Sequence, residues 1–298
     1  MKVYDKYRTA FDAAGPGNLT AAPVHVDIEL AKKCNLACIM CPYGSPEWIS
    51  EATQGMMATD MALALVDEMK VIGVLAMKPN FRGEPLLHRD LERILHAAQG
   101  MTDIRINTNL IGLTMPRAYA LRNLCDLIIV SMDGASRETY EAIRAGATWD
   151  RFTDNLRMLA SVPGKAVIQT QMVVQRDNAH ETVEFLQFAA DLGIEAVTKD
   201  VMDRGQDGAL LLGNRRAVGR RLCQQPFQRI VVGYDGVTYG CCSNWSDEYP
   251  TGRYPDESLL EIWQNTRTRE LRRMAEHPES GFPCRGCTVG TSYEWEQT

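Results

Sequence analysis

The sequence lacks three features that would direct it to a membrane, to secretion or to a nucleic acid. It contains no run of 18 apolar residues, which excludes a membrane-spanning helix. Its first residues, MKVYDKYRTAFDAAGPG, include no apolar segment of the kind found in signal peptides. Long Lys/Arg runs are absent and the formal net charge is −6, which disfavours a nucleic-acid partner. We therefore expect a cytoplasmic protein.

Internal repeats and low-complexity tracts are also absent, and the composition is that of a globular protein, with 45% hydrophobic and 23% charged residues. A chain of 298 residues is long enough for one large domain with an appendage, or for two domains. The nine cysteines are the distinctive feature. Structural disulfides are rare in the cytoplasm, so we expect these thiols to serve metal binding or catalysis.

Strand-like apolar segments alternate with helical patterns through the first two thirds of the chain. The expected strands are residues 24–30, 76–81, 103–109, 126–134, 166–174 and 196–200. The expected helices are residues 58–73, 89–99, 116–124, 136–146 and 181–193, with Thr59 or Asp60 capping the first and Ser136 the fourth. This alternation predicts a parallel sheet with right-handed crossovers. Six units suit an open, partial (β/α)6 barrel, with its chemistry at the carboxyl ends of the strands.

The pattern changes after residue 200. Residues 201–216 are Gly-rich and are expected to form a linker, and residues 228–241 a β-hairpin that turns at Asp235-Gly236. Residues 259–277 have a helical pattern. We expect three parts: an N-terminal extension (1–23), an α/β core (24–204), and a linker with a small α+β domain (205–298).

Three cysteines directly follow the first expected strand, in the segment AKKCNLACIMCPYG. Cys34, Cys38 and Cys41 have C-x3-C-x2-C spacing. Three thiolates on a tight loop can bind three corners of a [4Fe–4S] cluster and leave one iron open to another ligand. A zinc loop is the alternative, although zinc prefers four protein ligands with paired C-x2-C spacing.

A second set of cysteines lies in the C-terminal third. Cys223, Gly236 and Cys241 have C-x12-G-x4-C spacing, and Cys284 and Cys287 form a C-x2-C pair. The glycine in the hairpin turn lets the hairpin return toward the first of these cysteines. Four thiolates from two distant segments can close a second [4Fe–4S] site and stabilise the small domain. A zinc ribbon is the alternative.

The first cysteine motif and the strand ends around it resemble the radical S-adenosylmethionine (SAM) enzymes, whose fold is a partial (β/α)6 barrel. The resemblance covers about residues 24–200. It implies that the open iron chelates the amino and carboxylate groups of SAM, and that the reduced cluster cleaves SAM to a 5′-deoxyadenosyl radical. Met40 stands where the family usually has an aromatic residue.

The same resemblance assigns roles at the strand ends. Arg82-Gly83-Glu84 lies where the family has the Gly-Gly-Glu run that binds the amino group of SAM, with Arg82 in place of a glycine. The resemblance implies contacts to SAM from Gly83, Glu84, Asn109, Ser131 and Gln171, and implies that Asp133 lines the substrate site. Each of these could instead be a polar strand-end residue that caps a helix or turn.

Residues 215–290 resemble the twitch domain, a shortened SPASM domain with one auxiliary iron–sulfur cluster. The two resemblances together imply SAM as cosubstrate and two [4Fe–4S] clusters, one bound by Cys34, Cys38 and Cys41 and the other by Cys223, Cys241, Cys284 and Cys287. They also imply an external electron donor such as flavodoxin or ferredoxin.

Seven of the nine cysteines are then assigned, and Cys125 and Cys242 remain. Cys125 precedes the fourth expected strand, away from the expected chemistry, so we expect a buried, inert thiol. Cys242 directly follows a predicted cluster ligand and is expected near the gap between the clusters. A thiol can return a hydrogen atom to a carbon radical from the opposite face, which inverts that carbon. Alternatively, Cys242 packs in the interior or replaces Cys241 as the ligand.

The resulting hypothesis is a radical SAM epimerase that acts on an aminoglycoside in antibiotic biosynthesis, with Cys242 as the hydrogen donor. A dehydrogenase for an amino-sugar or aminocyclitol alcohol is the first alternative, with the auxiliary cluster as electron acceptor. A non-catalytic, metal-stabilised binding protein is the second. Only residues 1–23 precede the first strand, fewer than a leader-peptide-binding domain needs, which favours a small substrate. Carboxylates available for a cationic substrate are Asp235, Asp247, Glu248, Asp256, Glu257, Glu294 and Glu296.

Overall fold

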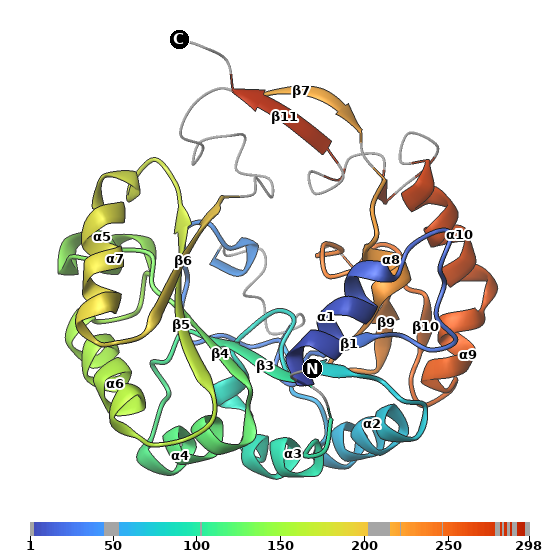
Figure 1. Cartoon of the computed structure of the whole chain (residues 1–298), viewed down its shortest axis with the longest axis horizontal. Helices are drawn as coiled ribbons and strands as arrows, with labels where there is room; N and C mark the ends of the chain where they lie inside the picture. Colours follow the sequence, from blue (N-terminus) through green and yellow to red (C-terminus); the bar gives the residue numbers. More distant parts are fainter. Residues whose placement is uncertain are drawn as a thin grey trace.

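The computed structural model describes residues 3–44, 54–101, 103–201, 215–220, 222–245, 247–277, 281, 283–284, 287 and 291–295. Its main sheet has nine strands in the order β10-β9-β8-β1-β2-β3-β4-β5-β6 (Figure 1). Parallel pairing runs from β8 to β6. Six of these strands are the predicted ones: β1 (His25–Ile28), β2 (Ala76–Lys78), β3 (Asp103–Thr108), β4 (Leu127–Ser131), β5 (Val167–Val174) and β6 (Glu195–Asp200). The predicted open, partial barrel is confirmed.

Helices cover the outer side of the curved sheet (Figure 1). They are α2 (Thr59–Val71), α3 (Leu91–Ala97), α4 (Met115–Leu124), α5 (Arg137–Ile143), α6 (Trp149–Ser161) and α7 (Thr182–Asp191). The sequence patterns predict all of them except α6. Ser136 caps α5 as expected, since its side chain accepts a hydrogen bond from the Thr139 N–H. The predicted cap of α2 is wrong: Ala58 is the N-cap, and the Thr59 hydroxyl instead donates to Asp90 Oδ2 at 2.6 Å.

Strand alternation gives the sheet an apolar outer face and a polar inner face. On β1, Val26 and Ile28 are fully buried in the main hydrophobic core. His25 and Asp27, at the alternate positions, are also buried, and His25 Nε2 lies 3.3 Å from Asp27 Oδ1. Burial lowers the pKa of His25 to about 4. Asp27 also accepts a hydrogen bond from Arg229 Nη1 at 3.0 Å, so the polar side chains of β1 have partners within the protein.

A helix that the sequence pattern did not predict, α1 (Val3–Ala13), lies on the inner side of the sheet (Figure 1). Its Tyr7 and Phe11 pack with Val24 and with Ala76, the first residue of β2. The Tyr7 hydroxyl lies 3.0 Å from His25 Nδ1, and burial raises the Tyr7 pKa to about 12. The expected N-terminal extension is therefore a helix that covers the amino end of the barrel.

The predicted hairpin is present and joins the barrel sheet. β8 (Arg229–Val232) pairs in parallel with β1, and β9 (Val237–Tyr239) returns antiparallel to β8. Gly236 has a φ of +85°, and a Cβ there would lie 2.0 Å from the Tyr254 carbonyl oxygen, so the turn requires glycine. β10 (Gly252–Arg253) extends the sheet beyond β9. The domain boundary expected at residues 204/205 falls outside the described residues, and the sheet continues beyond it.

The remaining C-terminal elements differ from the single helix predicted over 259–277. The structure has two helices there, α9 (Leu259–Gln264) and α10 (Thr266–Glu276). Asn265 separates them because its side chain accepts a hydrogen bond from the Thr268 N–H and so begins a new helix. The short helix α8 (Gln225–Gln228) precedes β8. β7 (Arg215–Arg220) and β11 (Thr291–Trp295) form a separate antiparallel pair, and the expected linker otherwise lies outside the described residues.

No helix within the described ranges has the length and apolar character needed to cross a bilayer.

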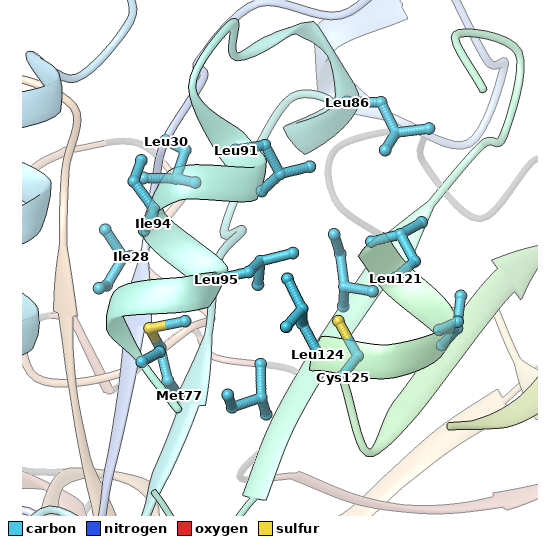
Figure 2. Close-up of a cluster of buried hydrophobic side chains, with 14 of the residues drawn as sticks. Ile28, Leu30, Met77, Leu86, Leu91, Ile94, Leu95, Leu121, Leu124 and Cys125 are labelled. Atoms are coloured by element: carbon cyan, nitrogen blue, oxygen red, sulfur yellow. The ribbon is translucent and has the colours of Figure 1, made fainter. Parts of the chain in front are cut away.

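Cys125 lies in the apolar layer between the sheet and helices α3 and α4, beside Leu121 and Leu124 (Figure 2). It has no exposed surface, and burial raises the pKa of its thiol, which confirms that it is a buried residue. Its predicted chemical inertness follows from this burial, because a thiol reacts as the thiolate.

Replacing Cys125 should affect stability and nothing else. Cys125→Ala should lower the free energy of unfolding by about 1 kcal/mol, since it leaves a small cavity. Cys125→Ser should lower it by about 1–3 kcal/mol, because a hydroxyl would be buried without a partner. Thermal unfolding measures both. Rapid labelling of Cys125 by a thiol reagent in the folded protein would contradict the assignment.

Candidate functional site

The three-cysteine loop, residues 34–41, leaves the carboxyl end of β1 and is held by backbone hydrogen bonds. The Cys41 N–H donates to the Cys38 carbonyl at 3.0 Å, which closes the second half of the loop. The Ile39 N–H donates to the Ile143 carbonyl at 3.0 Å and ties the loop to the end of α5. The thiols are therefore fixed at the end of the barrel where parallel barrels place their chemistry.

Two polar side chains approach the sulfurs of this loop. Asn109 Nδ2 lies 3.7 Å from Cys34 Sγ, and Arg144 Nη1 lies 3.8 Å from Cys38 Sγ. Burial, and then the charge of Glu84, raises the pKa of the Cys34 thiol to about 12. Iron binding needs thiolates, so N–H donors aimed at the sulfurs favour the ligating form. This loop fits the three-corner cluster site that its spacing predicts.

No sequence motif indicated that Arg144 would lie beside the cysteine loop. Its position depends on Asp133. Asp133 is fully buried and pairs with Arg144 at 2.5 Å between Oδ2 and Nη2. Its Oδ1 accepts a hydrogen bond from the Val173 N–H at 2.7 Å. The structure therefore gives Asp133 a different role from the expected one: it holds the guanidinium against Cys38 and lines no open site.

Glu84 joins the carboxyl ends of β2 and β3. Its Oε1 accepts hydrogen bonds from the Thr108 hydroxyl at 2.6 Å and the Leu86 N–H at 3.1 Å, and its Oε2 accepts one from the Asn109 N–H at 2.7 Å. A carboxylate has about four acceptor positions, so one remains on Oε2. Burial raises the Glu84 pKa, and the three donors oppose that rise. The predicted contact between Glu84 and the SAM ammonium stays a prediction, with a single acceptor position available for it.

Gly83 lies where the cluster loop crosses the end of β2. Its φ is +68°, and a Cβ would lie 2.1 Å from the Ala31 carbonyl oxygen and 2.7 Å from that of Lys33. Only glycine allows this approach of two backbones.

Ser131 and Gln171 are brought together as register partners on β4 and β5. The Met132 N–H donates to the Gln171 carbonyl at 2.9 Å and extends the pairing one residue beyond the end of β4. Both side chains are partly exposed there. Their expected contacts with SAM, like that of Asn109, stay predictions.

The second cysteine set also gathers. Burial raises the pKa of the Cys241 thiol, and the nearby thiols of three other cysteines raise it further: Cys242, Cys223 and Cys287. The Cys287 N–H donates to the Cys284 carbonyl at 3.1 Å, which forms the turn of the C-x2-C pair. The Cys223 N–H donates to the Ala275 carbonyl of α10 at 3.1 Å. All four predicted ligands thus lie on the C-terminal part, held by short local turns and by α10.

Among the described residues, no group of three or more His, Cys, Asp or Glu side chains converges on one point closely enough for a single metal ion. A [4Fe–4S] cluster differs in this respect, because each thiolate binds a different iron atom.

Cys242 lies beside this set but is not one of its four predicted ligands. It is partly buried against a small apolar cluster of Phe81, Val231 and Tyr239, and its Sγ lies 3.6 Å from Gln225 Oε1. Val231 is the register partner of Asp27 and therefore faces the inner side of the sheet. Phe81 follows β2 and directly precedes Arg82-Gly83-Glu84. Cys242 follows β9, which runs antiparallel to β8, and its partner Gln225 lies in the helix that precedes β8. The side chain of Cys242 thus packs on the inner side of the sheet near the amino end of β8, away from the end that carries the three-cysteine loop.

The carboxylates considered for a cationic substrate separate into groups. Asp247 is engaged by Arg82 and Lys32, so it is not free to bind an ammonium group. Asp235, Glu248 and Asp256 are exposed and Glu257 is partly exposed. The Glu294 side chain and Glu296 lie outside the described residues.

Two known families match separate stretches of the chain. The Radical SAM superfamily matches residues 28–189, and the SPASM family, an iron–sulfur cluster-binding domain, matches residues 223–288. The mycofactocin maturase MftC of Mycobacterium tuberculosis is 25% identical over 314 residues, which cover 89% of this chain and 76% of the maturase. A probable GTP 3′,8-cyclase of Saccharolobus islandicus is 28% identical over 173 residues, covering 57% of this chain and 54% of the cyclase.

Solved structures share the fold at low identity. SuiB of Streptococcus suis bound to S-adenosylmethionine has a TM-score of 0.72 at 13% identity, with 96% of this chain and 74% of SuiB covered. BtrN in complex with AdoMet and 2-DOIA has a TM-score of 0.59 at 19% identity, with 89% of this chain and 92% of BtrN covered.

A Cβ at residue 83 should displace the three-cysteine loop. Gly83→Ala would collide with the Ala31 carbonyl, so we expect iron to fall from about eight to about four per chain, since each cubic cluster holds four. Iron analysis after anaerobic reconstitution measures this. Gly112→Ala is the matched control, because the nearest atom to its added Cβ is the Leu86 Cβ at 3.6 Å. Full iron content in Gly83→Ala would contradict the close approach.

Proposed function

The chain belongs to the radical SAM superfamily, and from this premise we propose that it is an epimerase that inverts one carbon of an aminoglycoside. The proposed reaction is of the neomycin C to neomycin B type. The chain resembles neomycin C epimerase in its size, its two cluster motifs and its spare cysteine. Membership of a family of enzymes gives no support to a non-catalytic binding protein.

The two families imply three cofactors: SAM, a [4Fe–4S] cluster that binds SAM, and an auxiliary [4Fe–4S] cluster. When bound and reduced, they supply a 5′-deoxyadenosyl radical that removes a hydrogen atom from a substrate carbon. The chain's own contribution is to hold the loop of Cys34, Cys38 and Cys41 at the barrel end and to present hydrogen-bonding groups to SAM from the strand ends, among them the acceptor Glu84.

The position of Cys242 carries the proposal. Its thiol packs on the inner side of the sheet, 3.6 Å from Gln225 Oε1, one residue beyond Cys241 and outside the set of four predicted ligands. In the proposed reaction the Cys242 S–H bond breaks, its hydrogen atom bonds to the substrate radical from the opposite face, and a thiyl radical remains. One electron from an external donor such as flavodoxin or ferredoxin, and one proton from water, restore the thiol. The substrate is neither oxidised nor reduced overall.

A dehydrogenase is the second candidate. The structural similarity to BtrN covers 92% of that chain, and BtrN was solved in complex with AdoMet and 2-DOIA. This similarity favours the dehydrogenase. A dehydrogenase oxidises an alcohol of an amino sugar or aminocyclitol by losing a proton and a second electron from the substrate radical. It needs no thiol donor, so Cys242 distinguishes the two candidates.

Cys242→Ala should abolish inversion and leave SAM cleavage intact. Wild-type enzyme acting on neomycin C in deuterated water should place one deuterium in the epimerised product, because a thiol exchanges its hydrogen with solvent. The variant should still form 5′-deoxyadenosine but no inverted product. Mass spectrometry and chromatography measure both. Cys125→Ala, the other spare cysteine, is the matched control and should behave as wild type.

Two results would contradict the proposal. One is normal inversion by Cys242→Ala. The other is a wild-type product that carries a new carbonyl and no solvent deuterium, which would support the dehydrogenase.

A further inference from the structure

Four charged side chains from separate segments meet beside the predicted SAM site. Arg82 lies at the centre: its Nε and Nη2 donate to both oxygens of Glu29, at 2.6 and 2.9 Å. Its Nη1 donates to Asp247 Oδ1 at 2.5 Å and to the Trp245 carbonyl at 3.3 Å. Lys32 Nζ donates to the other oxygen of Asp247 at 2.6 Å. We call Glu29, Arg82, Asp247 and Lys32 the charge network.

The charge network is electrically balanced and largely buried. Its two cations and two anions sum to zero. The side chains of Glu29, Arg82 and Lys32 are 0%, 2% and 8% exposed, and that of Asp247 is 34% exposed. The Arg82 guanidinium also lies 4.7 Å from the Phe81 ring centroid and 5.7 Å from that of Tyr239. Buried charges persist only where their partners are fixed, so this arrangement permits little relative movement of the segments that it joins.

Those segments carry the two halves of the proposed chemistry. Lys32 lies two residues before Cys34, and Arg82 directly precedes Gly83. Asp247 lies five residues after Cys242. The network therefore links the cluster loop and the end of β2 to the segment of the donor thiol.

The backbone conformation of Asp247 is unusual, and its contacts with Arg82 and Lys32 explain it. Its φ is +60°, in the left-handed region that non-glycine residues seldom occupy. Such a conformation persists where surrounding contacts determine it. Contacts with Lys32, Tyr239 and Arg82 lower the pKa of Asp247 and keep it ionised, although burial opposes them.

We propose that Arg82 is a positioning residue that fixes Cys242 relative to the SAM-binding end of the barrel, and so couples SAM cleavage to hydrogen return. The inference rests on the proposed function in using Cys242 as the donor. Glycine, which the family has at this position, has no side chain to pair with Glu29 and Asp247. Without the Arg82 side chain, the 5′-deoxyadenosyl radical would still form, but the Cys242 thiol would no longer lie at the distance from the substrate that hydrogen return needs.

The test measures product formed per 5′-deoxyadenosine in Arg82→Gln, Asp247→Asn and the double variant. For Asp247→Asn we expect about eight irons per chain and SAM cleavage within about threefold of wild type, because Asp247 lies outside both the cluster loop and the Arg82-Gly83-Glu84 run. Product per 5′-deoxyadenosine should fall about tenfold to 100-fold, the size of effect that a displacement near 1 Å produces. The double variant should be no worse than the single ones, since both break one network.

Arg105→Gln is the matched control. Arg105 pairs with the buried Asp103 at 2.5 Å at the opposite end of the barrel, so its loss should lower stability and leave the product ratio unchanged. An unchanged ratio in the Arg82 and Asp247 variants, or an equal fall in Arg105→Gln, would overturn the proposal. Iron loss in Asp247→Asn as well as Arg82→Gln would also overturn it, because the network would then serve cluster binding.

Failure of the proposed function gives a different result. If the wild type forms a carbonyl product instead of an epimer, the epimerase is excluded, and Arg82 loses its role toward Cys242.

Discussion

The structure depends on the position of β1 between two parallel neighbours. β2 pairs with one edge of β1 and β8 pairs with the other, although about 200 residues separate β8 from β1 along the chain. Alternation along β1 sends Val26 and Ile28 into the outer core and leaves His25 and Asp27 on the inner side. The same strand ends in the cysteine loop. One four-residue strand thus organises the core, the buried polar positions of the inner side and the attachment of the C-terminal hairpin to the barrel.

Buried ion pairs then fix the segments that strand pairing brings together. Arg144 satisfies Asp133 and approaches Cys38, while Arg82 satisfies Glu29 and reaches Asp247. In both cases a buried carboxylate orients a guanidinium toward a segment that carries cysteine. Breaking such pairs by removing one partner leaves an uncompensated buried charge, which is more costly than the pair is stabilising. The site is therefore organised by charges that never need to contact substrate.

Local sequence patterns predicted the barrel strands well, but they did not predict which side chains pair across long stretches of the chain. The six barrel strands, the hairpin turning at Gly236 and the burial of Cys125 follow from alternation, turn chemistry and position along the chain. The break at Asn265 was missed because its cap depends on one side-chain hydrogen bond inside a continuous helical pattern. The roles of Arg144, Asp133 and Asp247 were missed because each depends on a partner that no local spacing encodes. Cysteine spacing, which is local, suggested the two iron–sulfur sites, and SAM followed from the resemblance to the radical SAM enzymes.

The continuation of the sheet through β8 has a consequence for dissecting the protein. A fragment that ends near residue 204 would contain every predicted strand of the barrel, yet it would uncover the edge of β1 along its entire length. An unpaired edge with buried apolar side chains offers a template for intermolecular strand addition. Such a fragment would tend to aggregate rather than behave as a minimal one-cluster enzyme. The hairpin of β8 and β9 is thus part of the barrel wall, although it lies in the C-terminal part of the chain.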